Sequence, residues 1–118
     1  MATIKSYTTI EQSRKLAEIL PIESADMYWY LATKGNHKAM FNEGYNEYGD
    51  FELPCWSLSA LFNVLPEGVI ENYYAPNLQK ENGKYSISYG NEELLCVADN
   101  PIDACVKLIL KLHELNLL

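Results

Sequence analysis

The sequence predicts a single α+β domain over residues 1–118, built as a two-layer sandwich. In this fold an antiparallel sheet, a three-stranded meander or larger, is packed by a C-terminal helix, and two further helices precede the meander. Three observations support the prediction. Apolar residues recur at helical spacing in three segments, residues 84–89 alternate as in a strand, and the last helix is apolar enough to require a sheet face.

The first helix is predicted to begin after Thr8, whose hydroxyl is expected to cap it. Glu11, three residues further on, completes the pattern of a capping box. The buried stripe of this helix is expected to comprise Ile10, Ser13, Leu16, Ala17 and Leu20. Pro21 disfavours helical geometry in the residue before it, so the helix should end near Leu20.

Residues 22–56 are the hardest part of the chain to assign. The aromatic segment 26–31 fits either a short strand or a packed loop. Residues 34–36 predict a turn and residues 37–41 fit a second short strand, so the two strands would form a hairpin. Residues 42–52 contain glycines, asparagines and four carboxylates, and we expect them to form a loop.

A second helix is predicted from the residues that follow. Ser57 is a suitable N-cap, and residues 66–68, Pro-Glu-Gly, end the helix. Its apolar stripe is expected to comprise Leu58, Leu61, Phe62 and Leu65.

The meander is predicted to follow this helix. Its first strand is expected at residues 69–74, with a break at residues 75–77, and residues 78–83 extend as a strand into a turn. Residues 84–89 place aromatic and apolar side chains on one face and serines on the other. Residues 93–98 form the next strand.

The last helix has the clearest start in the chain. Asn100 is a preferred cap, Pro101 suits the first helical position, and Asp103 places negative charge at the positive end of the helix dipole. Its buried stripe is expected to comprise Ile102, Cys105, Val106, Leu108, Ile109, Leu112 and Leu115.

The charge of the chain excludes some partner classes and favours others. With 16 acidic and 9 basic residues, the formal net charge is -7. This opposes binding to nucleic acid or anionic membranes, both of which require Lys and Arg, and it favours a basic protein partner or simple solubility. The three cysteines have no paired spacing and the N-terminus lacks a signal-peptide pattern, so we expect a cytoplasmic location and structural thiols.

No residue pattern predicts a catalytic, metal or cofactor site. The two histidines, His37 and His113, do not occur in metal-binding spacings, and the acids of residues 42–52 do not match a calcium loop. A Cys–His nucleophilic pair, for example Cys55 with His37, is formally open, and a glycosidase-type pair among the loop carboxylates has almost no specificity. We therefore expect no catalytic residue, no cofactor and no metal.

Aromatic and acidic side chains are concentrated in the middle third of the chain. This combination is typical of a recognition surface, because Tyr and Trp supply large, stiff contact areas. The candidate interaction surface consists of Tyr28, Trp29, Tyr30, Glu43, Tyr45, Glu47, Tyr48, Asp50 and Trp56. The alternative is that Tyr28, Trp29 and Trp56 fill the core.

Three segments carry a resemblance to known sequences. They are TIEQSRKLAEILPIESADMYWY at residues 9–30, PCWSLSALFNVLP at residues 54–66 and YSISYG at residues 85–90. Through them most of the chain, apart from about residues 32–53, resembles a group of small uncharacterised proteins of gut Bacteroidales and their prophages. The resemblance implies an intracellular, mobile-element origin and brings no known activity, cofactor or catalytic residue.

The C-terminal third carries a second resemblance. Residues 84–110, KYSISYGNEELLCVADNPIDACVKLIL, are similar to the strand–strand–helix core of HicB-like antitoxin domains. There a Y-x-V-x-F strand leads through a second strand into a helix that begins D-T-x-x-E-A, where this chain has DNPIDA at residues 99–104. The chain lacks the Pro-Gly-Cys turn of those domains and has two further helices upstream. The similarity implies a shared supersecondary unit.

The leading prediction is a non-enzymatic protein-binding or regulatory domain, with an antitoxin-like subunit or a prophage-encoded modulator as concrete versions. The alternative is a small-molecule-binding or enzymatic domain with an aromatic pocket around Trp29 and Trp56. Self-association through a sheet edge, which would give a homo-oligomer, is the third prediction.

Overall fold

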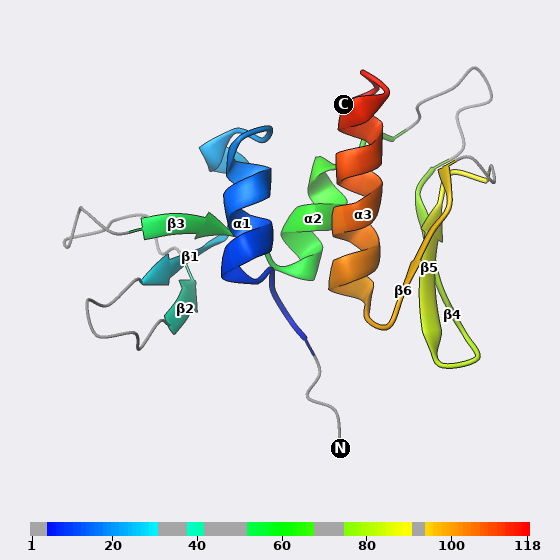
Figure 1. Cartoon of the computed structure of the whole chain (residues 1–118), viewed down its shortest axis with the longest axis horizontal. Coiled ribbons are helices and arrows are strands. Elements are labelled where there is room, and N and C mark those ends of the chain that lie inside the picture. Colours follow the sequence, from blue (N-terminus) through cyan, green and yellow to red (C-terminus); the bar gives the residue numbers. More distant parts are fainter. Residues whose placement is uncertain (1–4, 31–37, 42–51, 68–74, 91–93) are drawn as a thin grey trace.

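The computed structural model describes residues 5–30, 38–41, 52–67, 75–90 and 94–118. Within them, three α-helices lie between two three-stranded antiparallel sheets (Figure 1). The elements are α1 (Ile10–Ala17), a 3-10 turn η1 (Ile22–Ser24), β1 (Met27–Tyr30), β2 (Lys38–Phe41), β3 (Glu52–Cys55), α2 (Leu58–Val64), β4 (Asn77–Glu81), β5 (Lys84–Ser88), β6 (Cys96–Ala98) and α3 (Pro101–Glu114). The predicted α+β class is confirmed, as is the packing of the C-terminal helix on a meander.

Strands β4, β5 and β6 form the meander in that order. β5 lies where the alternation predicts a strand. The β4–β5 turn places Asn82 and Gly83 at φ values of 53° and 76°, a region that asparagine and glycine tolerate best. The strand predicted at residues 69–74 lies outside the described residues. β4 begins at Asn77, within the predicted break, because its pairing with β5 extends to that residue.

Helix α3 covers one face of the meander and begins where predicted. Asn100 Oδ1 accepts the backbone N–H of Asp103 at 2.8 Å, and Pro101 is the first helical residue. The predicted stripe is buried apart from its last member, Leu115, which is 50% exposed. The helix ends just before this residue, and Asn116 turns the chain away with a φ of 58°.

Helix α1 begins one residue later than predicted. Its N-cap is Thr9, whose Oγ1 accepts the N–H of Gln12 at 3.1 Å, and Gln12 Oε1 accepts the N–H of Thr9 at 3.0 Å. Thr8 is fully buried instead, and its hydroxyl accepts the N–H of Trp56. The predicted capping box with Glu11 is therefore wrong, because a tertiary contact uses the Thr8 hydroxyl. The helix ends at residue 17, three residues earlier than predicted.

Strands β2, β1 and β3 form the second sheet, with β1 at its centre. The antiparallel pairing of β1 with β2 confirms the predicted hairpin, while the predicted turn between them lies outside the described residues. Strand β3 is not predicted by the sequence analysis, which assigns Glu52 to a loop and leaves residues 53–55 unassigned. β3 is short and contains Pro54, which a strand tolerates at a sheet edge.

The main core lies between the three helices and the meander. Trp56 is its largest fully buried side chain, and its Nε1–H donates to Ser24 Oγ at 3.0 Å. Tyr89 joins the meander to the end of α2 by donating its hydroxyl to the Pro66 carbonyl at 2.7 Å, and burial raises its pKa to about 12. Leu20, just beyond the end of α1, also packs in this core.

The three cysteines are free. Cys55 and Cys105 are fully buried, as expected for structural thiols, and burial raises the pKa of Cys105 to about 12. Cys96 is half-buried, and burial raises its pKa despite the charges of Lys107 and Lys111. Among the described residues, no helix has the length and apolar character required to span a membrane.

Candidate functional site

The N-terminal segment, residues 5–9, lies beside the residues that join β3 to α2. Tyr7 forms an isolated antiparallel bridge with Ser57. The Thr8 N–H donates to the Trp56 carbonyl at 3.0 Å, and the Trp56 N–H donates to Thr8 Oγ1 at 3.1 Å. These bonds fix the segment next to the second sheet.

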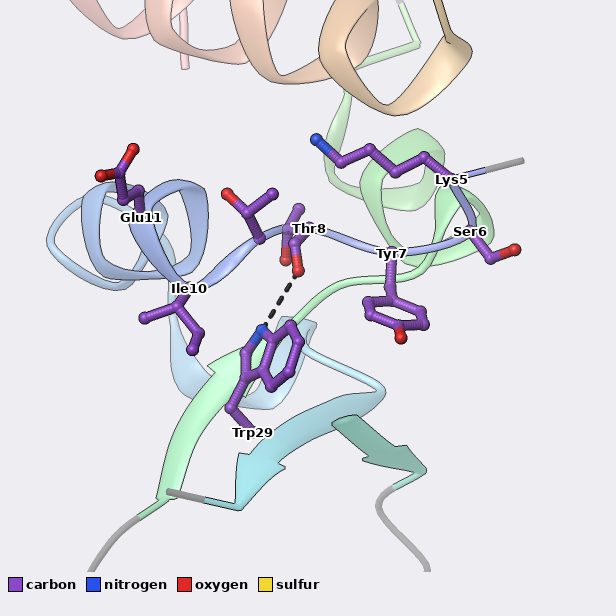
Figure 2. Close-up of a pocket in the computed structure, with 8 residues that line it drawn as sticks. Lys5, Ser6, Tyr7, Thr8, Ile10, Glu11 and Trp29 are labelled. Atoms are coloured by element: carbon purple, nitrogen blue, oxygen red, sulfur yellow. Dashed lines mark hydrogen bonds between the residues drawn. The ribbon is translucent and has the colours of Figure 1, made fainter. Parts of the chain in front are cut away.

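Trp29, on β1, lies next to this segment (Figure 2). Its Nε1–H donates to the Thr8 carbonyl at 3.1 Å. The Tyr7 ring meets the Trp29 ring edge to face, with centroids 5.6 Å apart and planes at 74°, which is a favourable geometry for an aromatic pair. Trp29 therefore holds the N-terminal segment against the sheet by both a hydrogen bond and a ring contact.

A groove opens beside this aromatic pair, with a volume of about 620 Å3. It is lined by residues 5–11 and Trp29, mostly through apolar atoms. Figure 2 shows Glu11 at one end and Tyr7 at the other, with Ile10 and Trp29 between them. Tyr7 is 36% exposed and Glu11 is also exposed. The groove is therefore an open, largely apolar surface with one carboxylate at its end.

The ammonium group of Lys5, which also lines the groove, is bound within the chain. Lys5 Nζ donates to the carboxylate of Asp103 at the start of α3 and to Gln12 Oε1 at 2.8 Å. Gln12 Nε2 and Asn100 Nδ2 donate to the same carboxylate at 2.7 and 2.8 Å. Burial alone raises the pKa of Asp103, but these hydrogen bonds outweigh it and the pKa lies below its ordinary value. This cluster attaches the N-terminal segment to α3.

A buried polar cluster lies behind the groove around Thr8. Thr8 Oγ1 is 2.8 Å from Ser13 Oγ and 3.6 Å from Cys55 Sγ. Burial raises the pKa of the Cys55 thiol more than its hydrogen bonds lower it, so the thiol stays protonated near neutral pH. A protonated, buried thiol is a poor nucleophile. His37, its predicted catalytic partner, lies outside the described residues.

The structure corrects the two roles predicted for Trp56. Its side chain is 0% exposed, so it belongs neither to an interaction surface nor to an aromatic pocket shared with Trp29. The reason is its position directly after β3, where both its backbone and its indole are bound to other core segments. The core alternative stated for this residue is confirmed.

The other candidates for the interaction surface fall into separate places. Trp29 lines the groove. Tyr28 and Tyr30 alternate with Trp29 along β1 and therefore belong to the opposite face of the sheet, where Tyr30 is 37% exposed and Tyr28 is half-buried. The candidates that lie outside the described residues are Glu43, Tyr45, Glu47, Tyr48 and Asp50. Of the candidates that the structure describes, Trp29 alone lines the groove.

Tyr7, Ile10 and Glu11 are groove residues that the sequence did not predict. Ile10 was assigned to a buried stripe and Glu11 to a capping box, whereas Ile10 is half-buried and Glu11 is exposed. Their arrangement depends on the bridge between Tyr7 and Ser57, which are far apart in the sequence. Local patterns carry no signal for such a pairing.

A second hollow, of about 380 Å3, lies between η1 and α2. Two acidic residues, Glu23 and Asp26, line it. Asp26 Oδ1 accepts the N–H of Ser57 at 2.9 Å and Oδ2 accepts the Ser57 hydroxyl, so this carboxylate stabilises the start of α2. In the described part of the chain, no group of three or more His, Cys, Asp or Glu residues is placed to hold a metal ion.

The groove of residues 5–11 and Trp29 is thus the larger of these two hollows and the one that contains a predicted surface residue. No protein-family model matches the chain, and neither a curated protein nor a solved structure matches it significantly.

Proposed function

We propose that the chain is a non-enzymatic protein-binding domain that holds a short segment of a partner protein in the groove. The observation that carries this proposal is the combination of an open aromatic wall with polar groups that are already bound inside the chain. Lys5 is bound to Asp103 and Gln12, and the Thr8 carbonyl accepts from Trp29. The groove therefore offers contact area rather than reactive groups, as peptide-binding grooves do.

The aromatic pair supports recognition in particular. Tyr and Trp are enriched among residues that dominate binding energy, because they bury large areas at low entropic cost. Trp29 lies on strand β1, and Tyr7 lies on the N-terminal segment that is bridged to Ser57, so both rings are held by paired backbone. We place the domain in the cytoplasm, which its three free cysteines support.

The test is selection of a phage-displayed peptide library on the immobilised full chain, followed by affinity measurement on two variants. Tyr7→Ala removes a groove ring that is 36% exposed, and Tyr30→Ala removes a ring of similar exposure, 37%, from the opposite sheet face. We expect Tyr7→Ala to weaken binding of the selected peptides by about fivefold or more, and Tyr30→Ala to leave it unchanged. Thermal unfolding of both variants controls for folding.

Two outcomes would refute the proposal. One is that no peptide is enriched above an unrelated immobilised protein. The other is that enriched peptides bind Tyr7→Ala as tightly as the unmodified chain.

A second candidate, small-molecule binding, is favoured by one observation. The groove volume of about 620 Å3 lies within the range of ligand pockets, about 300–1,000 Å3. A fragment screen by NMR would favour it if drug-sized compounds shift the Trp29 indole resonance with micromolar affinity. The openness of the groove at Tyr7 and Glu11 makes the peptide the preferred ligand.

A further inference from the structure

The groove has two chemically different ends. Around Tyr7, Ile10 and Trp29 its surface is apolar and aromatic. At the other end lies Glu11, and among the described residues its carboxylate has no hydrogen bond or ion pair. Each apolar side chain that covers the aromatic part would release ordered water, whereas the carboxylate favours a cation.

Glu11 forms no ion pair with a described lysine or arginine, although Arg14 and Lys15 lie about one turn further along α1. Among the described residues, Lys5 is the one lysine or arginine that lines the groove, and its ammonium is held by Asp103 and Gln12. The whole chain adds to this imbalance with its formal net charge of -7. A positively charged ligand is therefore attracted both at long range and at the Glu11 end.

Resting on the proposed function, we propose that the groove recognises a partner segment with an apolar side chain next to a basic one. The apolar side chain packs on Tyr7, Trp29 and Ile10. The neighbouring Lys or Arg extends towards the Glu11 carboxylate. In Figure 2 the Glu11 carboxylate points away from Ile10 and Trp29, so the basic side chain reaches it around the start of α1 with its long aliphatic stem.

This assignment differs from simple attraction between an acidic protein and a basic one. Attraction through net charge alone falls by the same amount when either of two exposed glutamates is changed to lysine. A contact at Glu11 depends on that position. Glu18 offers the matched comparison, because it is an exposed glutamate at the other end of α1 and does not line the groove.

The experiment uses three short peptides and the full chain labelled with 15N. The peptides are acetyl-Arg-Leu-Arg-amide, acetyl-Arg-Gly-Arg-amide and acetyl-Glu-Leu-Glu-amide, whose symmetry allows either chain direction. Binding is followed by the Trp29 indole N–H resonance, which is distinguished from that of Trp56 with a Trp56→Phe variant. We expect saturable shifts with Arg-Leu-Arg and weaker binding of the other two peptides.

Charge reversal then locates the contact. Glu11→Lys should change the ratio of affinities for Arg-Leu-Arg and Glu-Leu-Glu by about tenfold in favour of the acidic peptide. Glu18→Lys alters net charge equally and should change this ratio by less than about twofold. Thermal unfolding confirms that both variants remain folded.

Equal ratios for Glu11→Lys and Glu18→Lys would overturn the inference, as would equal binding of Arg-Gly-Arg and Arg-Leu-Arg. The proposed function fails separately. If displayed peptides bind in a Tyr7-dependent way but lack an apolar residue beside a basic one, peptide binding stands and this specificity is wrong. If no displayed peptide depends on Tyr7, the proposed function itself is wrong.

Discussion

Replacing Asp103 by asparagine tests how strongly the N-terminal segment, and with it the groove wall, is attached to α3. The change preserves the shape of the side chain but removes the charge that accepts hydrogen bonds from Lys5 and Gln12. The pair is partly buried, with side-chain exposures of 23% for Lys5 and 34% for Asp103. We therefore expect a loss between that of an exposed pair and that of a buried one, about 1.5 kcal/mol of the free energy of unfolding.

Asp99→Asn is the matched control. It breaks the ion pair between Asp99 and Lys84, whose side chains are 79% and 58% exposed. Water and salt screen this pair, so we expect a loss of less than about 0.5 kcal/mol. Urea unfolding followed by tryptophan fluorescence measures both variants against the unmodified chain.

The pH dependence gives the same experiment a second readout. The pKa of Asp103 in the folded chain lies below its unfolded value of about 3.9. A group with a lowered folded pKa stabilises the native state above the unfolded pKa, and this stabilisation is lost as the pH falls through the folded pKa. The difference between the unmodified chain and Asp103→Asn should therefore be constant from about pH 7 to about pH 5 and shrink below about pH 4. A constant difference throughout, or equal losses for the two aspartates, would refute the reasoning.

Two further predictions concern the core. Leu112→Ala removes a fully buried side chain and should lower the free energy of unfolding by about 2–5 kcal/mol. Leu115→Ala removes a side chain that is 50% exposed and should change the free energy of unfolding by less than about 0.5 kcal/mol. Equal losses for the two variants in urea unfolding would contradict the packing of α3. In the native chain, the half-buried Cys96 should react with a chromogenic disulfide reagent well before Cys55 and Cys105, which are fully buried. Reaction of all three thiols at a single rate would contradict the burial of Cys55 and Cys105.

The elements that the sequence predicted well are those specified by neighbouring residues. Helix α3 is the clearest case, because the Asn100 cap, Pro101 and the apolar stripe all lie within one segment. The alternation of residues 84–88 is equally local and identified β5. Leu115 was assigned wrongly because periodicity does not show where a helix ends, which here depends on the backbone at Asn116.

The features that the sequence missed depend on contacts between distant segments. Thr8 and Thr9 are equally good caps by residue type, and only the bond from the Trp56 N–H decides between them. Strand β3 has four residues, one of them a proline, so its pairing with β1 identifies it and its own pattern does not. The groove combines residues 5–11 with Trp29, a contact that no local spacing predicts.

The contact between Lys5 and Asp103 can form only after α3 has been synthesised. The two residues are 98 positions apart, so the groove wall is translated before the helix that anchors it. Closing so long a loop carries an entropic cost, and the contact forms only when α1 and α3 are both in place. A nascent chain that has emerged as far as β5 therefore displays Tyr7 and Trp29 without this anchor.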